Sequence, residues 1–321
     1  MNETTARRDG FLAALAAYGL WGMLPAFFVA LDPSSPVEIL AWRIFLSLIF
    51  CVVLLLFMRR LPAVVRLLGQ KKILGLSAIA SVFILINWSV YVYASLNQFI
   101  VEAALGYFIN PLVTVALGVI VLKEKLRIGQ WLSLGLAVIA VVVLAVGLGR
   151  IPVISLTLAF SFGFYGFVKN RMGPSVKSLD SLTLETLWLF PVAIGLLVYV
   201  SLGTGLSLGT LGGVHTALLL SAGAVTSIPL LFFGAAARRL PLSIMGLMQY
   251  LAPVMQFLFG VVIMGEPMPL ERWIGFALVW IALVILSIDA LRHRRNRLPV
   301  VETPSHASQS SKNRCESVTW M

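Results

Sequence analysis

The chain is built mainly from apolar blocks of about 20 residues, and this feature restricts its fold more than any other. A helix of that length crosses the roughly 30 Å hydrocarbon core of a bilayer. Backbone groups in lipid must be hydrogen-bonded internally, so such blocks must be helices, and the alternating ten-residue pattern of a membrane β-barrel is missing. Hydrophobic residues make up 60% and charged residues 12% of 321 positions, which excludes a soluble protein. We predict an all-α polytopic membrane protein.

The apolar blocks predict ten transmembrane spans. Their limits are 11–31, 37–57, 73–95, 103–122, 131–148, 151–169, 183–202, 215–235, 243–264 and 273–291. Span seven is the least regular because Pro191 interrupts it, and spans five and six are separated only by Gly149 and Arg150 before Pro152. An even number of spans places both termini on one side of the membrane.

Basic residues alternate between the connecting segments. The segments after spans two, four, six, eight and ten carry clusters of Arg and Lys, whereas those of the other parity hold only Arg150 and Arg272. Basic loops stay in the cytoplasm. We therefore predict cytoplasmic termini, with residues 1–10 as a short N-terminal segment and the polar residues 292–321 as a disordered tail. This pattern explains the net charge of +11, so we expect no nucleic-acid binding.

A stretch at residues 102–131 returns near the C-terminus, at residues 244–273. At a constant offset the matched pairs are Leu105 and Leu247, Pro111 and Pro253, Gly118 and Gly260, Glu124 and Glu266, and Trp131 and Trp273. Residues 11–148 and 151–291 therefore form two five-helix repeats. Because each repeat has an odd number of spans, the two are inverted, an arrangement that transporters use with the substrate site near the midplane between the repeats.

Glycines form a second match between the repeats. Tyr18–Gly22 resembles Phe162–Gly166, and in both segments two glycines flank an aromatic residue. The glycine pairs are Gly19 with Gly22 and Gly163 with Gly166. They indicate either close helix packing or the lining of a cavity. Pro111 frees a backbone carbonyl one turn earlier, which is an acceptor for a site or a simple kink.

Arg43 lies inside span two, roughly two helical turns from its outer end. A charge at that depth is costly and usually faces a cavity or a partner. The alternative is that the side chain extends to the headgroups. Glu38 and Glu102, on the same outer side, are candidate ion-pair partners, and we favour a binding role for Arg43.

Polar and aromatic side chains follow several other spans. Asn87, Tyr91 and Ser95 recur every four residues and share one helix face, and similar stripes occur on spans four and nine. Such stripes either line a ligand cavity or bond neighbouring helices. The predicted substrate-binding residues are Arg43, Asn87, Trp88, Tyr91, Tyr107, Asn110, Gln249 and Trp21. We interpret Lys169 and Glu185, near the cytoplasmic ends of spans six and seven, as ordinary interface charges.

Catalytic and nucleotide-binding signatures are not found. The sequence has no Walker-type phosphate loop, no HExxH helix and no nucleophile elbow, and its three histidines are dispersed. We expect no cofactor, no metal and no enzymatic activity. A membrane-embedded lipid-modifying enzyme would need a nucleophile, metal ligands or paired acids at one depth in the membrane, and Glu38, Glu102 and Glu185 do not cluster in this way. A non-transporting membrane subunit is the other alternative, but it leaves Arg43 and the polar stripes without a role.

With two inverted halves, each ending in a Pro, Gly, Glu, Trp helix pair, the chain resembles the EamA domains of the drug/metabolite transporter superfamily. It is most similar to the RarD group, through YGLWGMLP at 18–25, EILAWR at 38–43, NWSVYVYA at 87–94 and EAALGYFINPL at 102–112. The resemblance covers residues 10–292. Trp42 departs from the pattern, which has a histidine before the arginine, so a proton-linked role is not expected there.

The resemblance implies a permease of the bacterial inner membrane that works by export. Together with the residue pattern, it predicts a secondary active transporter of a small metabolite or drug-like solute. Its site would lie between the two repeats and reach each side by alternating access. The expected partners are the small-molecule substrate and the lipid bilayer, and the substrate, the coupling ion and the oligomeric state stay open.

Overall fold

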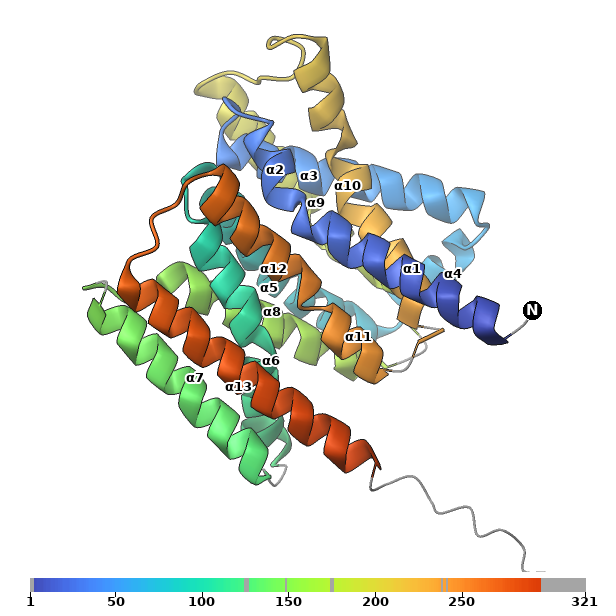
Figure 1. The fold of residues 1–321 in the computed structure, drawn as a ribbon. Coiled ribbons are helices and arrows are strands. Elements are labelled where there is room, and N and C mark those ends of the chain that lie inside the picture. The colour runs from blue at the N-terminus through green and yellow to red at the C-terminus, as the bar shows by residue number, and fades with distance from the viewer. Residues whose placement is uncertain are drawn as a thin grey trace, which may run out of the picture.

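The computed structural model describes residues 3–123, 127–147, 149–173, 176–237, 239–240 and 242–295, and these residues form helices joined by short turns and loops (Figure 1). The helices are α1 (Glu3–Gly22), α2 (Leu24–Val29), α3 (Pro36–Phe57), α4 (Leu61–Leu68), α5 (Lys71–Leu96), α6 (Ile100–Leu122), α7 (Ile128–Gly147), α8 (Val153–Met172), α9 (Ser178–Leu202), α10 (Gly213–Ala237), α11 (Leu242–Met248), α12 (Leu251–Leu258), the π-helix η1 (Phe259–Ile263) and α13 (Leu270–Arg295). The matched residue Glu124 and the tail beyond residue 295 lie outside the described residues.

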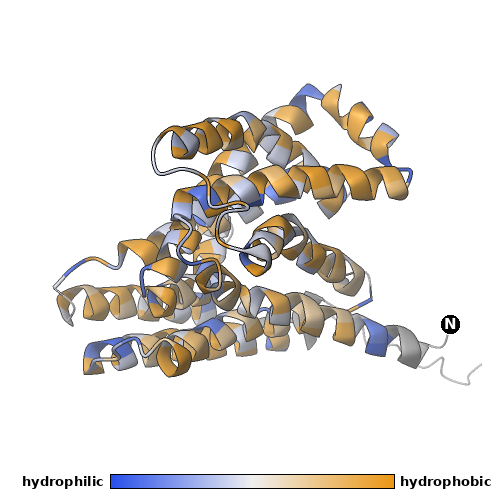
Figure 2. Ribbon diagram, turned by 90° about the horizontal axis from the view of Figure 1, so that it is seen from above, coloured by the Kyte–Doolittle hydropathy of each residue, from blue (hydrophilic) through white to orange (hydrophobic). Residues whose placement is uncertain are grey.

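Eight of these helices are long and apolar enough to cross a membrane. They are α3, α5, α6, α7, α8, α9, α10 and α13, which match predicted spans two to eight and ten. Apolar residues cover much of their length, and hydrophilic segments gather mainly at helix ends and loops (Figure 2). α9 runs through Pro191 without a break. α4 is a short helix inside a segment that the sequence predicts as a loop.

Predicted spans one and nine are interrupted helices, so eight of the ten predicted spans correspond to continuous helices. Span one divides at Met23 into α1 and α2 because Pro25 has no N–H to donate to the carbonyl of Trp21. Span nine divides after Met248 into α11, α12 and η1, and Pro253 lies in the first turn of α12. Broken helices leave backbone groups free inside the bundle, where side chains or a ligand satisfy them.

The largest helix–helix contacts join the two halves of the chain. α7 packs along α13, α3 along α9, α5 and α6 along α8, and α1 and α3 along α10 (Figure 1). One buried cluster combines Phe108 of α6, Ala140 of α7 and Phe276 of α13. Residues 11–148 and 151–291 therefore share their cores rather than forming two separate compact domains.

Two glycines allow the closest of these approaches. A side chain at Gly223 of α10 would collide with the backbone of α3 at Leu46, and a Cβ at Gly106 of α6 would lie 2.6 Å from the carbonyl oxygen of Ser155. Small residues let helix backbones approach in a membrane, where packing rather than water exclusion holds helices together. These contacts fix α3 against α10 and α6 against α8, the helices that carry the candidate site.

Candidate functional site

Arg43 lies inside the bundle, with 5% of its surface exposed. Its guanidinium carbon is 4.4 Å from the centre of the Trp88 ring and 5.3 Å from that of Phe28. Its Nε donates a hydrogen bond to Thr226 Oγ1 at 3.0 Å. Aromatic faces attract a cation, and this attraction strengthens away from water. The ring contacts hold the guanidinium plane while leaving its outer nitrogens available.

Polar atoms beside Arg43 have no partner. Arg43 Nη1 and the hydroxyl of Tyr91 are buried, and neither forms a hydrogen bond with the described residues. The side chain of Arg43 also interacts electrostatically with Tyr91 and Tyr107. Buried polar groups are nearly always hydrogen-bonded, so such atoms need an explanation. A ligand that accepts hydrogen bonds would satisfy both donors.

Asn87 of α5 connects three helices. Its Oδ1 accepts a hydrogen bond from the hydroxyl of Tyr107 on α6 (3.0 Å), and its Nδ2 donates to Ser161 Oγ on α8 (3.2 Å). The ring centres of Tyr91 and Tyr107 are 5.5 Å apart in an edge-on contact. These contacts bring together Arg43, Asn87, Trp88, Tyr91 and Tyr107, five of the eight predicted binding residues.

The other three predicted residues have separate surroundings. Trp21 packs against Tyr18 and Phe233, with ring centres 5.5 and 5.8 Å away. The Trp21 carbonyl freed by Pro25 accepts a hydrogen bond from Gln256 Nε2 at 3.1 Å. Gln249 is half-buried at the end of α11, where it contacts Tyr250.

Asn110 on α6 is half-buried, and its Oδ1 has no partner among the described residues. Gln256, with 3% of its surface exposed, likewise keeps a free Oε1. The ninth span therefore offers Gln256 rather than Gln249 as the amide with a buried, unpaired oxygen.

The candidate ion-pair partners of Arg43 are bonded elsewhere. Glu102 pairs with Arg150, and Glu38 Oε1 accepts hydrogen bonds from Trp42 Nε1 (3.3 Å) and from the backbone N–H of Ser207 (2.7 Å). Five residues along an α-helix correspond to a rotation of about 140°, so Glu38 and Arg43 point to different sides of α3. This expectation was therefore wrong, and no carboxylate of the described residues pairs with Arg43.

The four glycines of the two matched segments differ in how closely neighbouring atoms pack against them. A Cβ at Gly22 would lie 2.8 Å from Met255, and one at Gly163 would lie 2.8 Å from Val113. At Gly19 and Gly166 no atom lies within 4 Å of that position. Close packing thus applies to one glycine of each pair. Pro111 lies inside a continuous α6, whereas its counterpart Pro253 begins a new helix.

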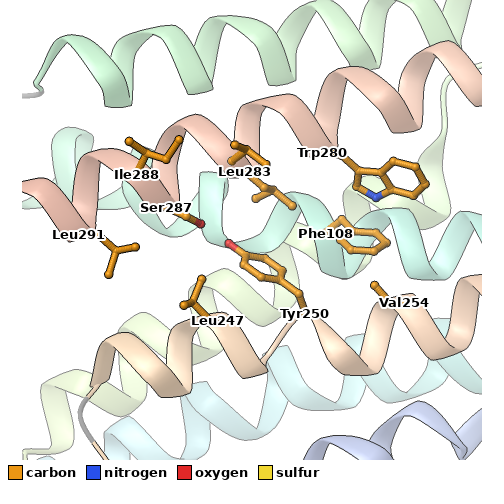
Figure 3. A pocket seen from close by; sticks show the side chains of 10 residues that line it. Phe108, Leu247, Tyr250, Val254, Trp280, Leu283, Ser287, Ile288 and Leu291 are labelled. Carbon is orange, nitrogen blue, oxygen red and sulfur yellow. The ribbon is translucent and has the colours of Figure 1, made fainter.

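A groove of about 400 Å³ lies between α6, α11, α12 and α13, and Arg43 is not part of its lining (Figure 3). Its lining is almost wholly apolar and includes Phe108, Leu247 and Trp280. The Tyr250 hydroxyl points towards Ser287 at the middle of the groove. None of the predicted binding residues lines this groove, and its apolar surface does not suit an anion. The described residues also contain no group of three or more His, Cys, Asp or Glu placed to hold a metal ion.

Known proteins resemble this chain over nearly all of its length. The EamA-like transporter family matches residues 9–146. Protein RarD of Streptomyces exfoliatus is 50% identical over 92% of this chain and 93% of that protein. The chain belongs to the RarD group of EamA-like transporters. An uncharacterized transporter of Pseudomonas aeruginosa is 39% identical over 92% of this chain and 98% of that protein.

A crystal structure shares the fold with a TM-score of 0.55 at 19% identity, over 90% of this chain and 99% of that chain. As a RarD-type EamA transporter, the protein is a multi-pass membrane transporter. The family resemblance in the sequence is thereby confirmed, and relatives in Pseudomonas aeruginosa and Vibrio cholerae carry the name of transporters.

In this RarD-type chain, one buried ion pair was not predicted from the sequence. Glu185 of α9 has no exposed side-chain surface and forms an ion pair with Lys169 of α8, with 2.8 Å between Oε1 and Nζ. The interpretation of both residues as ordinary interface charges was therefore wrong. Their positions near helix ends suggested exposure, but α3 and α5 pack over this part of α9. The sequence did contain one indication of this cluster, because Tyr165 and Lys169 are one turn apart on α8 and so share a face.

Proposed function

We propose that this protein is a secondary active transporter that exports a small anionic metabolite or drug-like solute across the bacterial inner membrane by alternating access. The family supports membrane transport. The anionic character of the solute rests on Arg43, and the access mechanism rests on the relation between the two halves.

The proposal rests on a buried arginine that has no carboxylate partner among the described residues. Arg43 is 5% exposed, and its Nη1 is unpaired beside the unpaired Tyr91 hydroxyl. An isolated charge inside a membrane protein needs a counter-charge. A guanidinium presents two parallel N–H groups that match a carboxylate or phosphate. A solute anion supplies this counter-charge when it binds.

Neighbouring side chains give the site shape and hydrogen bonds. Trp88, Tyr91 and Tyr107 form aromatic walls, and Asn87 holds the Tyr107 hydroxyl in place. Ligand sites are usually apolar cavities with a few well-placed polar groups. This composition favours an organic anion with an apolar or aromatic body over a small inorganic ion.

Helix packing supports two equivalent repeats. Exchanging the halves converts α1 into α8, α3 into α9, α5 into α10, α6 into the α11–α12 segment and α7 into α13. The α7–α13 and α3–α9 contacts then map onto themselves, and the α5–α8 contact maps onto α10–α1. The α6–α8 contact maps onto α12–α1. A pattern that survives this exchange is expected when two repeats rock against each other around one site.

The alternation of basic loops predicts that both termini lie in the cytoplasm. A reporter fused after Arg297 should therefore be active in the cytoplasm, and one inserted near Gly205 should be active in the periplasm. Signals from one and the same side would contradict both the topology and the inverted repeats.

Thermal stabilisation across a library of anionic and neutral metabolites tests the proposed solute. Binding to the folded state alone raises its stability, so an anionic substrate should raise the Tm of the wild type and not that of Arg43→Gln. Arg239→Gln, at an exposed arginine near the end of α10, is the matched control and should respond like wild type. Equal stabilisation of Arg43→Gln would contradict the anion site. Conversion of a stabilising compound into a product would favour a lipid-modifying enzyme instead.

A further inference from the structure

The apolar groove separates part of α13 from the broken ninth span (Figure 3). At one end the groove is closed by Trp280, whose ring centre lies 6.1 Å from that of Phe108 and 5.7 Å from that of Phe257. At the other end lie Leu247 of α11 and Leu291 of α13, which are both exposed. The groove is therefore closed by aromatic rings at one end and open at the other.

The length of the groove matches one leaflet of a membrane. Trp280 and Leu291, at its two ends, are separated by about 16 Å of α13. The hydrocarbon core of a bilayer is roughly 30 Å thick, so one leaflet accounts for about 15 Å. Because α13 is long and apolar enough to span a membrane, the groove fits within the hydrocarbon of a single leaflet.

The groove opens to hydrocarbon rather than to water. Val254, Val284 and Ile288 line it and are exposed. Exposed apolar side chains on membrane-spanning segments face the acyl chains of the bilayer. An empty hollow there would leave its lining without van der Waals partners on one side. An acyl chain is therefore the group that fills this groove.

Basic residues follow at the open end. Arg292, directly after Leu291, is exposed, and the sequence continues with Arg294, Arg295 and Arg297. Four arginines immediately beyond a spanning helix are typical of a binding site for anionic phospholipids. The basic-loop pattern predicts that this end of α13 faces the cytoplasm. A lipid of the inner leaflet with its chain in the groove would therefore place its headgroup against positive charge.

The apolar lining alone does not select a lipid. Acyl chains are as apolar as leucine side chains, so a chain that moves from the bilayer into the groove gains little hydrophobic energy. Selectivity therefore comes from the charge of the headgroup, outside the apolar lining, and from the fit of a single chain.

A second copy of this chain suits the groove less well than a lipid does. A two-fold dimer in the membrane would bring the same surface of both copies together. The arginines that follow Leu291 in each copy would then lie on the same side of the bilayer and close to one another. Like charges oppose such a contact, whereas an anionic headgroup neutralises them.

We infer that this groove binds one anionic phospholipid of the inner leaflet, with an acyl chain between α13 and the broken span and its phosphate beside Arg292. The inference goes beyond the proposed transport and does not use the Arg43 site. Leu247, Tyr250 and Val254 belong to α11, to the break and to α12, so one chain contacts both pieces of span nine. The bound lipid therefore connects both pieces to α13 and stabilises the folded protein.

Native mass spectrometry of the full-length protein tests this inference, because it resolves bound lipids and oligomers by mass. The delipidated protein in detergent is titrated with phosphatidylglycerol, which is anionic, or with phosphatidylcholine, which has no net charge, with identical acyl chains. The first phosphatidylglycerol should bind at least about fivefold more tightly, the effect of about one arginine at a membrane surface. Equal affinities for the two lipids would overturn the inference.

A matched pair of variants locates the acyl chain. Ile288 lines the groove and Ile281 does not, although both lie on α13 and are 43% and 51% exposed. Ile288→Trp fills the groove and should abolish binding of the first phosphatidylglycerol, while Ile281→Trp should bind like wild type. Phosphatidylglycerol should also raise the Tm of the wild type and of Ile281→Trp but not that of Ile288→Trp.

A second pair locates the headgroup. Arg292→Gln should weaken binding of phosphatidylglycerol about fivefold and leave that of phosphatidylcholine unchanged. Arg66→Gln, at an exposed arginine of α4 on the same predicted side of the membrane, is the control for loss of charge and should bind like wild type. Arg292 is exposed, so this variant gives a result even if Ile288→Trp does not fold.

Wild-type affinity for phosphatidylglycerol in either Ile288→Trp or Arg292→Gln would overturn the inference. A dimer that Ile288→Trp dissociates would also overturn it, because the groove would then hold a second copy. Arg43→Gln should keep the bound lipid while losing stabilisation by anionic solutes. Failure of the lipid site and failure of the proposed transport site therefore give different results.

Discussion

Glu102 of α6 and Arg150, between α7 and α8, form an ion pair with 2.8 Å between Oε2 and Nη2. The Glu102 side chain is 4% exposed, and its Oε1 also accepts a hydrogen bond from the backbone N–H of Ile154 at the start of α8 (3.3 Å). Negative charge at a helix N-terminus is favourable. Glu102 therefore joins α6 to α8 independently of Arg43.

Because Glu102 and Arg43 have separate partners, mutations of these two residues should have additive effects on stability. Glu102→Gln should lower the Tm because a buried carboxylate with two donors is lost, and Arg150→Gln should also lower it, because the Glu102 side chain, 4% exposed, then has no counter-charge. Arg43→Gln and Glu102→Gln should add to within roughly 0.5 kcal/mol in a double-mutant cycle on thermal stability. A larger coupling energy would mean that Arg43 and Glu102 are partners after all.

Arg43→Lys should fold well and bind the anionic solute more weakly, by roughly 1–3 kcal/mol, the scale of a charge-assisted hydrogen bond. Lysine keeps the charge but loses the planar fork that grips an anion and stacks on Trp88. Arg43→Gln should bind more weakly still. Thr226→Val removes only the partner of Nε and should cause a smaller loss. Titration of each variant with the solute found by thermal stabilisation measures these affinities, and wild-type affinity in Arg43→Lys would refute bidentate binding.

Gly163→Ala and Gly19→Ala form a matched pair. A Cβ at Gly163 would lie 2.8 Å from Val113 Cγ1, so Gly163→Ala should lower stability by about 1–3 kcal/mol through overpacking. No atom lies within 4 Å of the same position at Gly19, where alanine should be neutral or stabilising by up to about 1 kcal/mol. Thermal unfolding of the two purified variants measures this difference in stability. Equal destabilisation would show that the packing around Gly19 differs from that described.

Glu266 gives a pH prediction outside the membrane spans. Its carboxylate accepts hydrogen bonds from the backbone N–H groups of Ile100 and Val101, which begin α6. Burial raises the pKa of Glu266 above its ordinary value of 4.5, Glu102 raises it further, and the two N–H groups and Arg272 oppose this.

A raised pKa means that the folded protein binds this proton more tightly than the unfolded chain does. The resulting stability is present at low pH and is lost as pH rises through the raised pKa. Glu266→Gln does not titrate, so its Tm relative to wild type should increase between about pH 4 and pH 7. Parallel Tm curves for the two proteins over this range would contradict the shift.

Much of the fold follows from apolar block length, which requires no tertiary information. Eight predicted spans correspond to continuous helices, and even the proline in α9 does not break it. The breaks at Met23 and after Met248 were not predicted, because a proline either bends or ends a membrane helix depending on which neighbour donates a hydrogen bond to the freed carbonyl. At Trp21 that neighbour is Gln256, 235 residues away.

The candidate site was predicted in part because helical spacing identifies residues on one face. Helical spacing placed Asn87 and Tyr91 correctly on a shared face of α5, but it does not identify the residues of other helices that they contact. Thr226 looks like an ordinary residue of a membrane helix until α10 packs against α3. Glu185 is near a loop in the sequence, so it looked like a charge at the level of the lipid headgroups. The sequence does not show that neighbouring helices cover this part of α9.

The distance in sequence between Arg43 and Thr226, 183 residues, has a consequence for biosynthesis. At ribosomal speeds the helix that carries Arg43 is made on the order of ten seconds before α10 exists. During that interval the arginine lacks the hydroxyl that satisfies it, and the faces of α3 and α7 that pack on the second half are bare. The first half therefore cannot reach its final packing until the helices of the second half have been made.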